Sequence, residues 1–142
     1  MSFGIGFTDV VSGTNFVLIG NNTIGVAFYE GWFLRLKNTA FRTNLSSSDT
    51  ITDTLYITPT GISSQNYQSS WVQRTDTNTP VGTVKVFMVS SGKLHYAKIW
   101  DDGELIRSFV PVRRNSDNKC GMYDTVSGTF FGSATSTAFT CP

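Results

Sequence analysis

Apolar and polar residues alternate in short runs along this chain, the pattern of β-strands with one buried face. No window of eleven or more residues keeps the 3.6-residue period of an amphipathic helix. We therefore expect an all-β chain of about ten to twelve strands, a number typical of a two-sheet sandwich. The predicted strands are Phe3–Thr8, Asn15–Ile19, Thr23–Tyr29, Trp32–Lys37, Thr50–Thr58, Ser69–Gln73, Thr83–Ser90, Lys93–Trp100, Leu105–Val112, Gly121–Asp124, Thr129–Phe131 and Ala138–Thr140.

Residues that tolerate a positive φ angle separate many of these runs, as tight hairpin turns require. Such turns predict antiparallel pairing of successive strands. They are Gly20-Asn21-Asn22, Glu30-Gly31, Ser91-Gly92, Asp102-Gly103 and Ser127-Gly128.

The turn at Asp102-Gly103 is the clearest of them, because the runs LHYAKIW and ELIRSFVPV on its two sides both suit strands. A two-residue loop would place Trp100 opposite Leu105. It would also place Lys98 opposite Arg107, and like charges in that position are destabilising. A longer loop with a shifted register is the alternative.

The segment Thr58–Pro80 is polar and contains two of the four prolines, so we expect long loops around a short strand. Within it, aromatic rings lie close to amide and guanidinium groups in sequence. Rings stack on the apolar faces of sugars, and amide and guanidinium groups bond their hydroxyls. The candidate ligand-binding residues are Gln65, Asn66, Tyr67, Trp71 and Arg74.

The alternative for this segment is structural. Trp71 could cap the core, and its amide residues could be solvated turns. Trp32 and Trp100 lie in apolar strands and are expected in the core.

Length and charge narrow the range of functions. With 142 residues, the chain is expected to form a single domain over residues 1–142. The formal net charge is +1 and 15% of residues are charged, so no basic field favours nucleic acid as a partner. No run approaches the ~20 apolar residues of a membrane-spanning helix, and the first ten residues lack the features of a secretion signal, which predicts a soluble chain.

Two cysteines, Cys120 and Cys141, flank a predicted hairpin near the C-terminus. They could form one disulfide if the protein matures outside a reducing cytoplasm. The alternative is a pair of buried free thiols.

The sequence from Lys93 to Thr140 also carries a pattern of strands and turns that resembles a known family. Its matching residues are Lys98, Ile99, Trp100, Asp102, Gly103, Leu105, Ile106, Arg107, Phe109, Pro111, Gly121, Met122, Tyr123, Asp124, Phe130 and Phe131. This resembles the C-terminal signature of a concanavalin A-like, laminin-G-like jelly-roll family of tailed-phage tail fibres and secreted gut-bacterial proteins. The resemblance implies an antiparallel two-sheet jelly-roll sandwich.

The same resemblance implies structural roles for the signature residues, which include Trp100 and the turn at Asp102-Gly103. Tyr123 and Asp124 would hold the turn before Thr129. Phe109 and Phe131 would fill the core, and Pro111 would mark a strand end.

The opening segment usual in this family is absent, so a sheet edge could be open to another chain. The resemblance therefore implies a homo-oligomer, with a trimer as the expected form.

The chain is poor in groups for catalysis. His95 is the single histidine, and we interpret it as a strand residue, since no Ser-His-Asp or Cys-His arrangement is visible. The two glutamates, Glu30 and Glu104, lie beside turns rather than in the paired arrangement of a glycoside hydrolase. Asp101-Asp102 and Asp49/Asp53 suit turns better than a calcium loop. We expect no enzyme, no metal and no cofactor.

These observations lead to the hypothesis of a non-catalytic recognition domain of a phage tail fibre or virion appendage. Its partners would be a glycan or other receptor on the bacterial surface. One alternative is a structural virion protein, a decoration or fibre-tip module that binds other viral chains. Another is an adhesin domain at the surface of a bacterium.

Overall fold

The computed structural model describes residues 1–11, 16–20, 25–29, 33–36, 39–42, 50–58, 61–66, 84–88, 91–134 and 138–141. This part of the chain contains twelve β-strands and no helix, and hence no helix able to cross a membrane. The prediction of an all-β chain is confirmed for these residues. The strands are β1 (Ser2–Val11), β2 (Phe16–Gly20), β3 (Gly25–Tyr29), β4 (Phe33–Leu36), β5 (Thr39–Arg42), β6 (Thr50–Thr58), β7 (Gly61–Ser64), β8 (Lys85–Met88), β9 (Lys93–Asp101), β10 (Glu104–Arg113), β11 (Cys120–Asp124) and β12 (Thr129–Phe131).

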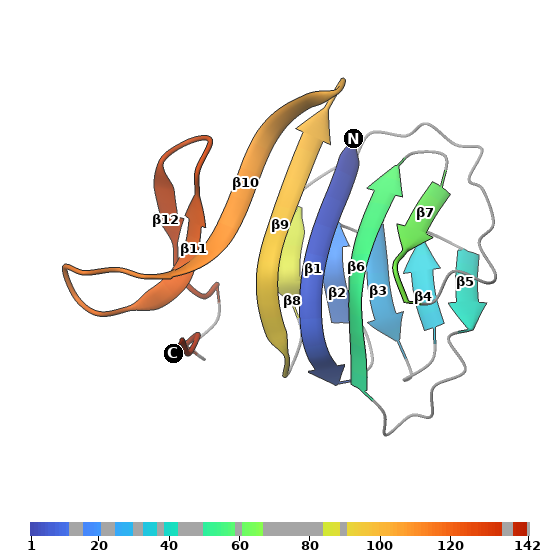
Figure 1. Cartoon of the computed structure of the whole chain (residues 1–142), viewed down its shortest axis with the longest axis horizontal. Coiled ribbons are helices and arrows are strands. Elements are labelled where there is room, and N and C mark those ends of the chain that lie inside the picture. Colours follow the sequence, from blue (N-terminus) through green and yellow to red (C-terminus); the bar gives the residue numbers. More distant parts are fainter. Residues whose placement is uncertain are drawn as a thin grey trace.

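The strands form two antiparallel sheets (Figure 1). The larger sheet has the order β12-β11-β10-β9-β1-β6-β7, and the smaller has the order β5-β4-β3-β2-β8. In Figure 1 the smaller sheet lies behind the middle strands of the larger one. Two antiparallel layers agree with the predicted β-sandwich.

The core lies between these layers, because strands of both sheets contribute fully buried side chains. In β6 every second residue from Ile51 to Ile57 is buried, as the alternating sequence predicts. Complete burial of one such large apolar side chain contributes about 1.5–3 kcal/mol. The core residues are Phe3, Ile5, Phe7, Val10, Leu18, Ile19, Ile51, Leu55, Ile57, Ala97, Ile99 and Phe109.

Bulges interrupt the alternation of buried and exposed positions in the larger sheet. In β1 the pairing with β6 shifts between Phe7 and Val10, so both residues are buried although they are three positions apart. In β9 the pairing with β1 shifts at His95. Leu94 therefore packs against the core together with Ala97.

The hairpin between β9 and β10 has the two-residue turn and not the longer loop. Asp102 and Gly103 both adopt positive φ angles, 48° and 79°, as the tight turn between twisted strands requires. Trp100 pairs with Leu105, which confirms the register next to the turn.

Farther along this hairpin, a bulge at Ile106 shifts the register by one residue. Lys98 consequently pairs with Ser108, and Arg107 pairs with Ile99. The like-charge pair is therefore avoided by a bulge rather than by a longer loop.

Most of the strand predictions that fall on described residues are right, and a few are wrong. Thr50–Thr58 and Thr129–Phe131 have the predicted bounds. Strands β5 and β7 were not predicted, and β7 lies in the segment expected to be loops. Ala138–Thr140 is not a strand, because this short segment is attached through the neighbouring Cys141 and not along a sheet edge. Ser69–Gln73 lies outside the described residues.

One end of the larger sheet extends beyond the smaller sheet (Figure 1). We call this part the arm: Val110–Arg113 of β10 with β11 and β12, and the turns that join them. Its exposed apolar side chains include Tyr123, Val126 and Phe131, which are 38%, 47% and 41% exposed. Among the described residues, no second layer covers the arm as the smaller sheet covers the middle of the larger one.

The position of the arm corrects two predictions. Phe131 does not fill the core, because it lies on the arm; it packs edge-to-face against Phe109 at 5.7 Å between ring centroids. Pro111 does not end a strand, because β10 continues to Arg113. Pairing of β10 with β9 ends at Phe109, so the missing N–H of Pro111 interrupts no ladder on that side.

Asp124 holds the turn between β11 and β12. The side chain is fully buried and accepts hydrogen bonds from Ser108 N (2.8 Å), Val126 N (3.1 Å) and the Ser127 hydroxyl (2.6 Å). Arg107 Nε lies 3.5 Å from its Oδ2. Burial alone would raise the pKa of Asp124, but these hydrogen bonds outweigh it and the pKa lies below its ordinary value.

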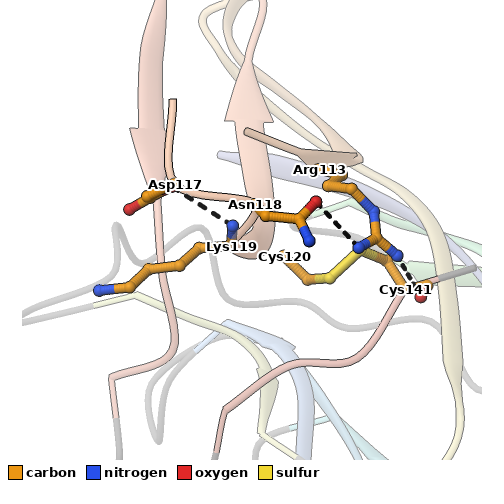
Figure 2. Close-up of a disulfide and its surroundings, with 6 residues drawn as sticks. All are labelled: Arg113, Asp117, Asn118, Lys119, Cys120 and Cys141. Atoms are coloured by element: carbon orange, nitrogen blue, oxygen red, sulfur yellow. Dashed lines mark hydrogen bonds between the residues drawn. A yellow bond between two sulfur atoms is a disulfide. The ribbon is translucent and has the colours of Figure 1, made fainter. Parts of the chain in front are cut away.

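A disulfide joins Cys120, at the start of β11, to Cys141 (Figure 2). Their Cα atoms are 5.7 Å apart, and no free cysteine remains. Arg113 lies beside the bond and donates hydrogen bonds to Asn118 Oδ1 (3.1 Å) and to the carbonyl oxygen of Cys141 (3.0 Å). The C-terminal segment is therefore attached to the arm both covalently and by hydrogen bonds.

Candidate functional site

A shallow groove lies on the outer face of the larger sheet, opposite the core. Its volume is about 350 Å³. Strands β1, β6 and β9 and the segment from β7 to Gln65 contribute its walls and floor. The lining residues are Gly4, Thr54, Leu55, Tyr56, Ser63, Gln65, Tyr96, Lys98 and Trp100.

Strand alternation explains why polar and aromatic groups gather here. In β9, Ala97 and Ile99 are buried in the core, so the neighbouring residues point to the outer face. Those neighbours are Tyr96, Lys98 and Trp100, all half-buried. β6 adds Tyr56, which is 46% exposed. Three aromatic rings consequently share the outer face, two on β9 and one on β6, with β1 between these strands.

Two glycines of β1 make the floor on which the rings lie. A Cβ atom at Gly4 would be 3.2 Å from two ring atoms of Trp100, and one at Gly6 would be 2.7 Å from Cε1 of Tyr96. Real Cβ contacts are rarely so short. The absence of side chains at these positions therefore lets both rings lie directly on the sheet.

The rings of Tyr56 and Trp100 form an angled pair. Their centroids are 5.5 Å apart and their planes meet at 82°, a favourable edge-to-face geometry. The Nζ atom of Lys98 lies 5.7 Å from the centroid of Tyr96, within the range of a cation–π interaction. These contacts fix the orientation of the rings before any ligand binds.

Hydrogen-bonding groups surround the rings. The side chains of Thr54, Ser63 and Gln65 are exposed along the groove. Hydroxyl and amide groups both donate and accept hydrogen bonds. The groove therefore combines flat apolar surfaces with groups that suit the hydroxyls of a sugar.

A buried carboxylate holds Gln65 at the edge of the groove. Asp53, 3% exposed, accepts hydrogen bonds from the Ser64 hydroxyl and from the N–H groups of Gln65 (2.9 Å) and Asn66 (3.1 Å). Asn66 in turn donates to the carbonyl oxygen of Thr52 (2.6 Å). Asp53 thus fixes the backbone after β7, and the interpretation of Asp53 as a turn residue is wrong, because it lies inside β6.

The residues predicted for ligand binding are only partly placed. Gln65 lines the groove, and Asn66 follows it in the chain. The other three, Tyr67, Trp71 and Arg74, lie outside the described residues, as does Trp32.

Trp100 corrects the sequence-based interpretation. It was expected in the core, but it lies on the outer face and lines the groove. The hydrophobicity of its strand could not decide this, since β9 has apolar residues on both faces. A signal was present in β1, where Gly4 and Gly6 alternate with Phe3, Ile5 and Phe7 and leave one face without side chains.

The residues considered for catalysis are dispersed. His95 lies on an exposed part of β9 and hydrogen-bonds through Nε2 to the Thr8 hydroxyl. Glu104 is exposed at the start of β10, and Glu30 and Asp49 lie outside the described residues. Within the described part of the chain, no group of three His, Cys, Asp or Glu residues could hold a metal ion.

No protein-family model matches the chain, and no curated protein and no solved structure matches it either. A function for the chain therefore has to be inferred from the groove itself.

Proposed function

We propose that this chain is a non-catalytic recognition domain that binds a glycan in the groove on its outer face. The observation that carries the proposal is the set of rings of Tyr56, Tyr96 and Trp100 on a floor without side chains at Gly4 and Gly6. Sugars present apolar C–H faces to such rings, while their hydroxyls bond to nearby amides and hydroxyls. Fixed rings also reduce the entropy lost on binding.

The resemblance of the C-terminal sequence to the jelly-roll family supports a more specific fold and a location for this domain. It supports a jelly-roll arrangement of the two sheets and a place in a phage tail fibre or virion appendage. The glycan would then belong to a bacterial cell surface. The same groove would serve a bacterial surface adhesin, and the disulfide suits either place outside a reducing cytoplasm.

The test is binding to an array of bacterial surface glycans, followed by calorimetry on each ligand found. Trp100→Ala and Tyr56→Ala should each weaken binding by about tenfold or more, because each removes a stacking surface. Gly4→Ala should also weaken it, since the added methyl group displaces the Trp100 ring without removing any ligand contact.

Tyr123→Ala is the matched control, because it removes an exposed ring from the arm, away from the groove. Circular dichroism should show the same fold for all four variants. Equal affinity of the wild type and Trp100→Ala would exclude the groove as the site. Turnover of a bound polysaccharide by the wild type would contradict a non-catalytic role.

A structural virion role is the second candidate, favoured by the exposed apolar residues of the arm. Tyr123 and Phe131 are exposed on opposite faces of the β11–β12 pair, and β12 is the edge strand of the described sheet, so another chain could cover or pair with this end. A trimer that persists in dilute solution, dissociates in a Phe131→Ser variant and binds no glycan would favour this role over recognition.

A further inference from the structure

The described residues that line the groove carry an uneven charge. Of the nine described residues that line it, Lys98 is the only charged one, and no carboxylate is among them. Asp101, the last residue of β9, and Asp102, in the turn that follows, are exposed and do not line the groove. Among the described lining residues, a ligand in the groove therefore meets one positive charge and no negative charge.

Lys98 is free to receive an anion. No carboxylate of the described residues lies within ion-pair distance of its ammonium group. Its Nζ atom lies 5.7 Å from the centroid of the Tyr96 ring. Its directly paired neighbours are Gly4 on β1 and Ser108 on β10, both uncharged. The Lys98 side chain is half-buried on the outer face, and an anion in the groove would meet its ammonium group in a medium less polar than bulk water, where their attraction is stronger.

We infer that the groove selects an acidic saccharide, whose anionic group pairs with Lys98 while its ring stacks on the aromatic side chains. This inference rests on the proposed function. The recognised group is a sugar-borne anion, either a carboxylate of a uronic or similar acid or a sulfate or phosphate ester. An ammonium ion forms charge-assisted hydrogen bonds with all of these, and such bonds are about twice as strong as neutral ones.

The test uses an array of bacterial surface polysaccharides, each printed in three forms: native, carboxyl-reduced, and stripped of sulfate and phosphate esters. The wild type should bind at least one acidic polysaccharide about tenfold more tightly than its neutralised form. The form that loses binding identifies the anion as a carboxylate or an ester.

Lys98→Gln should bind the native and neutralised forms equally, whereas Lys98→Arg should keep the preference because it keeps the charge. Lys93→Gln is the matched control, since Lys93 is an exposed lysine of the same strand that does not line the groove. Its preference should equal that of the wild type.

The outcomes separate the two proposals. Equal binding of native and neutralised forms by the wild type, or a preference that survives in Lys98→Gln, would overturn the acidic preference and leave glycan recognition standing. Binding of no polysaccharide by the folded wild type would overturn both.

Discussion

The middle of the larger sheet and its arm belong to one continuous ladder of strands, yet they are stabilised in different ways. In the middle, Phe3, Ile5 and Phe7 of β1 are at most 1% exposed and face the smaller sheet. In the arm, no described apolar side chain reaches the same burial. The arm instead has the buried carboxylate of Asp124 and the Cys120–Cys141 disulfide.

The difference shows what a second layer contributes to a sheet. Where two layers pack, apolar burial can supply most of the stabilisation. Where one layer extends alone, polar and covalent links must limit the freedom of its strands. The following predictions test this difference, first across both regions and then within the arm.

The largest effect should come from removing a phenylalanine ring in the middle of the sheet, compared with removing one in the arm. Phe3→Ala should lower the free energy of unfolding by about 3–5 kcal/mol, because it leaves a cavity in the core. Phe131→Ala should lower it by about 1 kcal/mol, since the residue is 41% exposed and mainly loses its edge-to-face contact with Phe109. Urea unfolding of both variants measures the difference, and equal losses would contradict the comparison.

The disulfide should have the next largest effect. Its two cysteines are 21 residues apart, and opening a loop of that size costs about 2–4 kcal/mol. Cys120→Ser combined with Cys141→Ser should therefore lower the urea midpoint. Hydrogen exchange should become faster in β11 and β12 and stay unchanged in β1 and β6; uniform acceleration would show that the arm does not unfold separately.

Asp124 should have a smaller, pH-dependent effect. Asp124→Asn should cost about 1–3 kcal/mol at neutral pH, because the N–H donors of Ser108 and Val126 lose a charged acceptor. Since the folded pKa is lowered, the stabilisation is complete above the unfolded pKa of about 3.9 and is lost as pH falls through the folded pKa. Unfolding midpoints measured from pH 6 to 2 should fall more steeply for the wild type than for Asp124→Asn; parallel curves would contradict this role.

The smallest effect should come from the exposed ion pair of the arm. Arg114 hydrogen-bonds to Asp117 through Nε (2.9 Å) and Nη2 (2.5 Å), and this bond lowers the pKa of Asp117 to about 2. An NMR titration of the Asp117 carboxyl should show that midpoint, and Arg114→Gln should return it towards 3.8. A midpoint near 3.8 in the wild type would show that the pair does not form in solution.

The sequence predicted the fold best where local signals agree. The alternation in Thr50–Thr58 and the positive-φ pair Asp102-Gly103 both appear in the structure as expected. Short strands such as β5 and β7, four residues each, carry too few residues for a pattern. They depend on pairing with strands already in place.

The candidate site was predicted less well, partly because of the bulges. Each bulge exchanges the two faces of a strand, so the face of Trp100 could not be read from the alternation in β9, where His95 is the extra residue. The proposed groove also joins residues far apart in sequence, from Gly4 to Trp100. Only the order of the strands in the sheet brings them together.

The covalent link near the C-terminus also sets the path of mechanical force. A pull applied at Cys141 would enter the sheet directly at Cys120, the first residue of β11. The hairpin turn after Asp124 and the short strand β12 would lie outside the loaded path. The last strand of the ladder, which has a single neighbour in the described sheet, would therefore carry no tension until the disulfide is reduced.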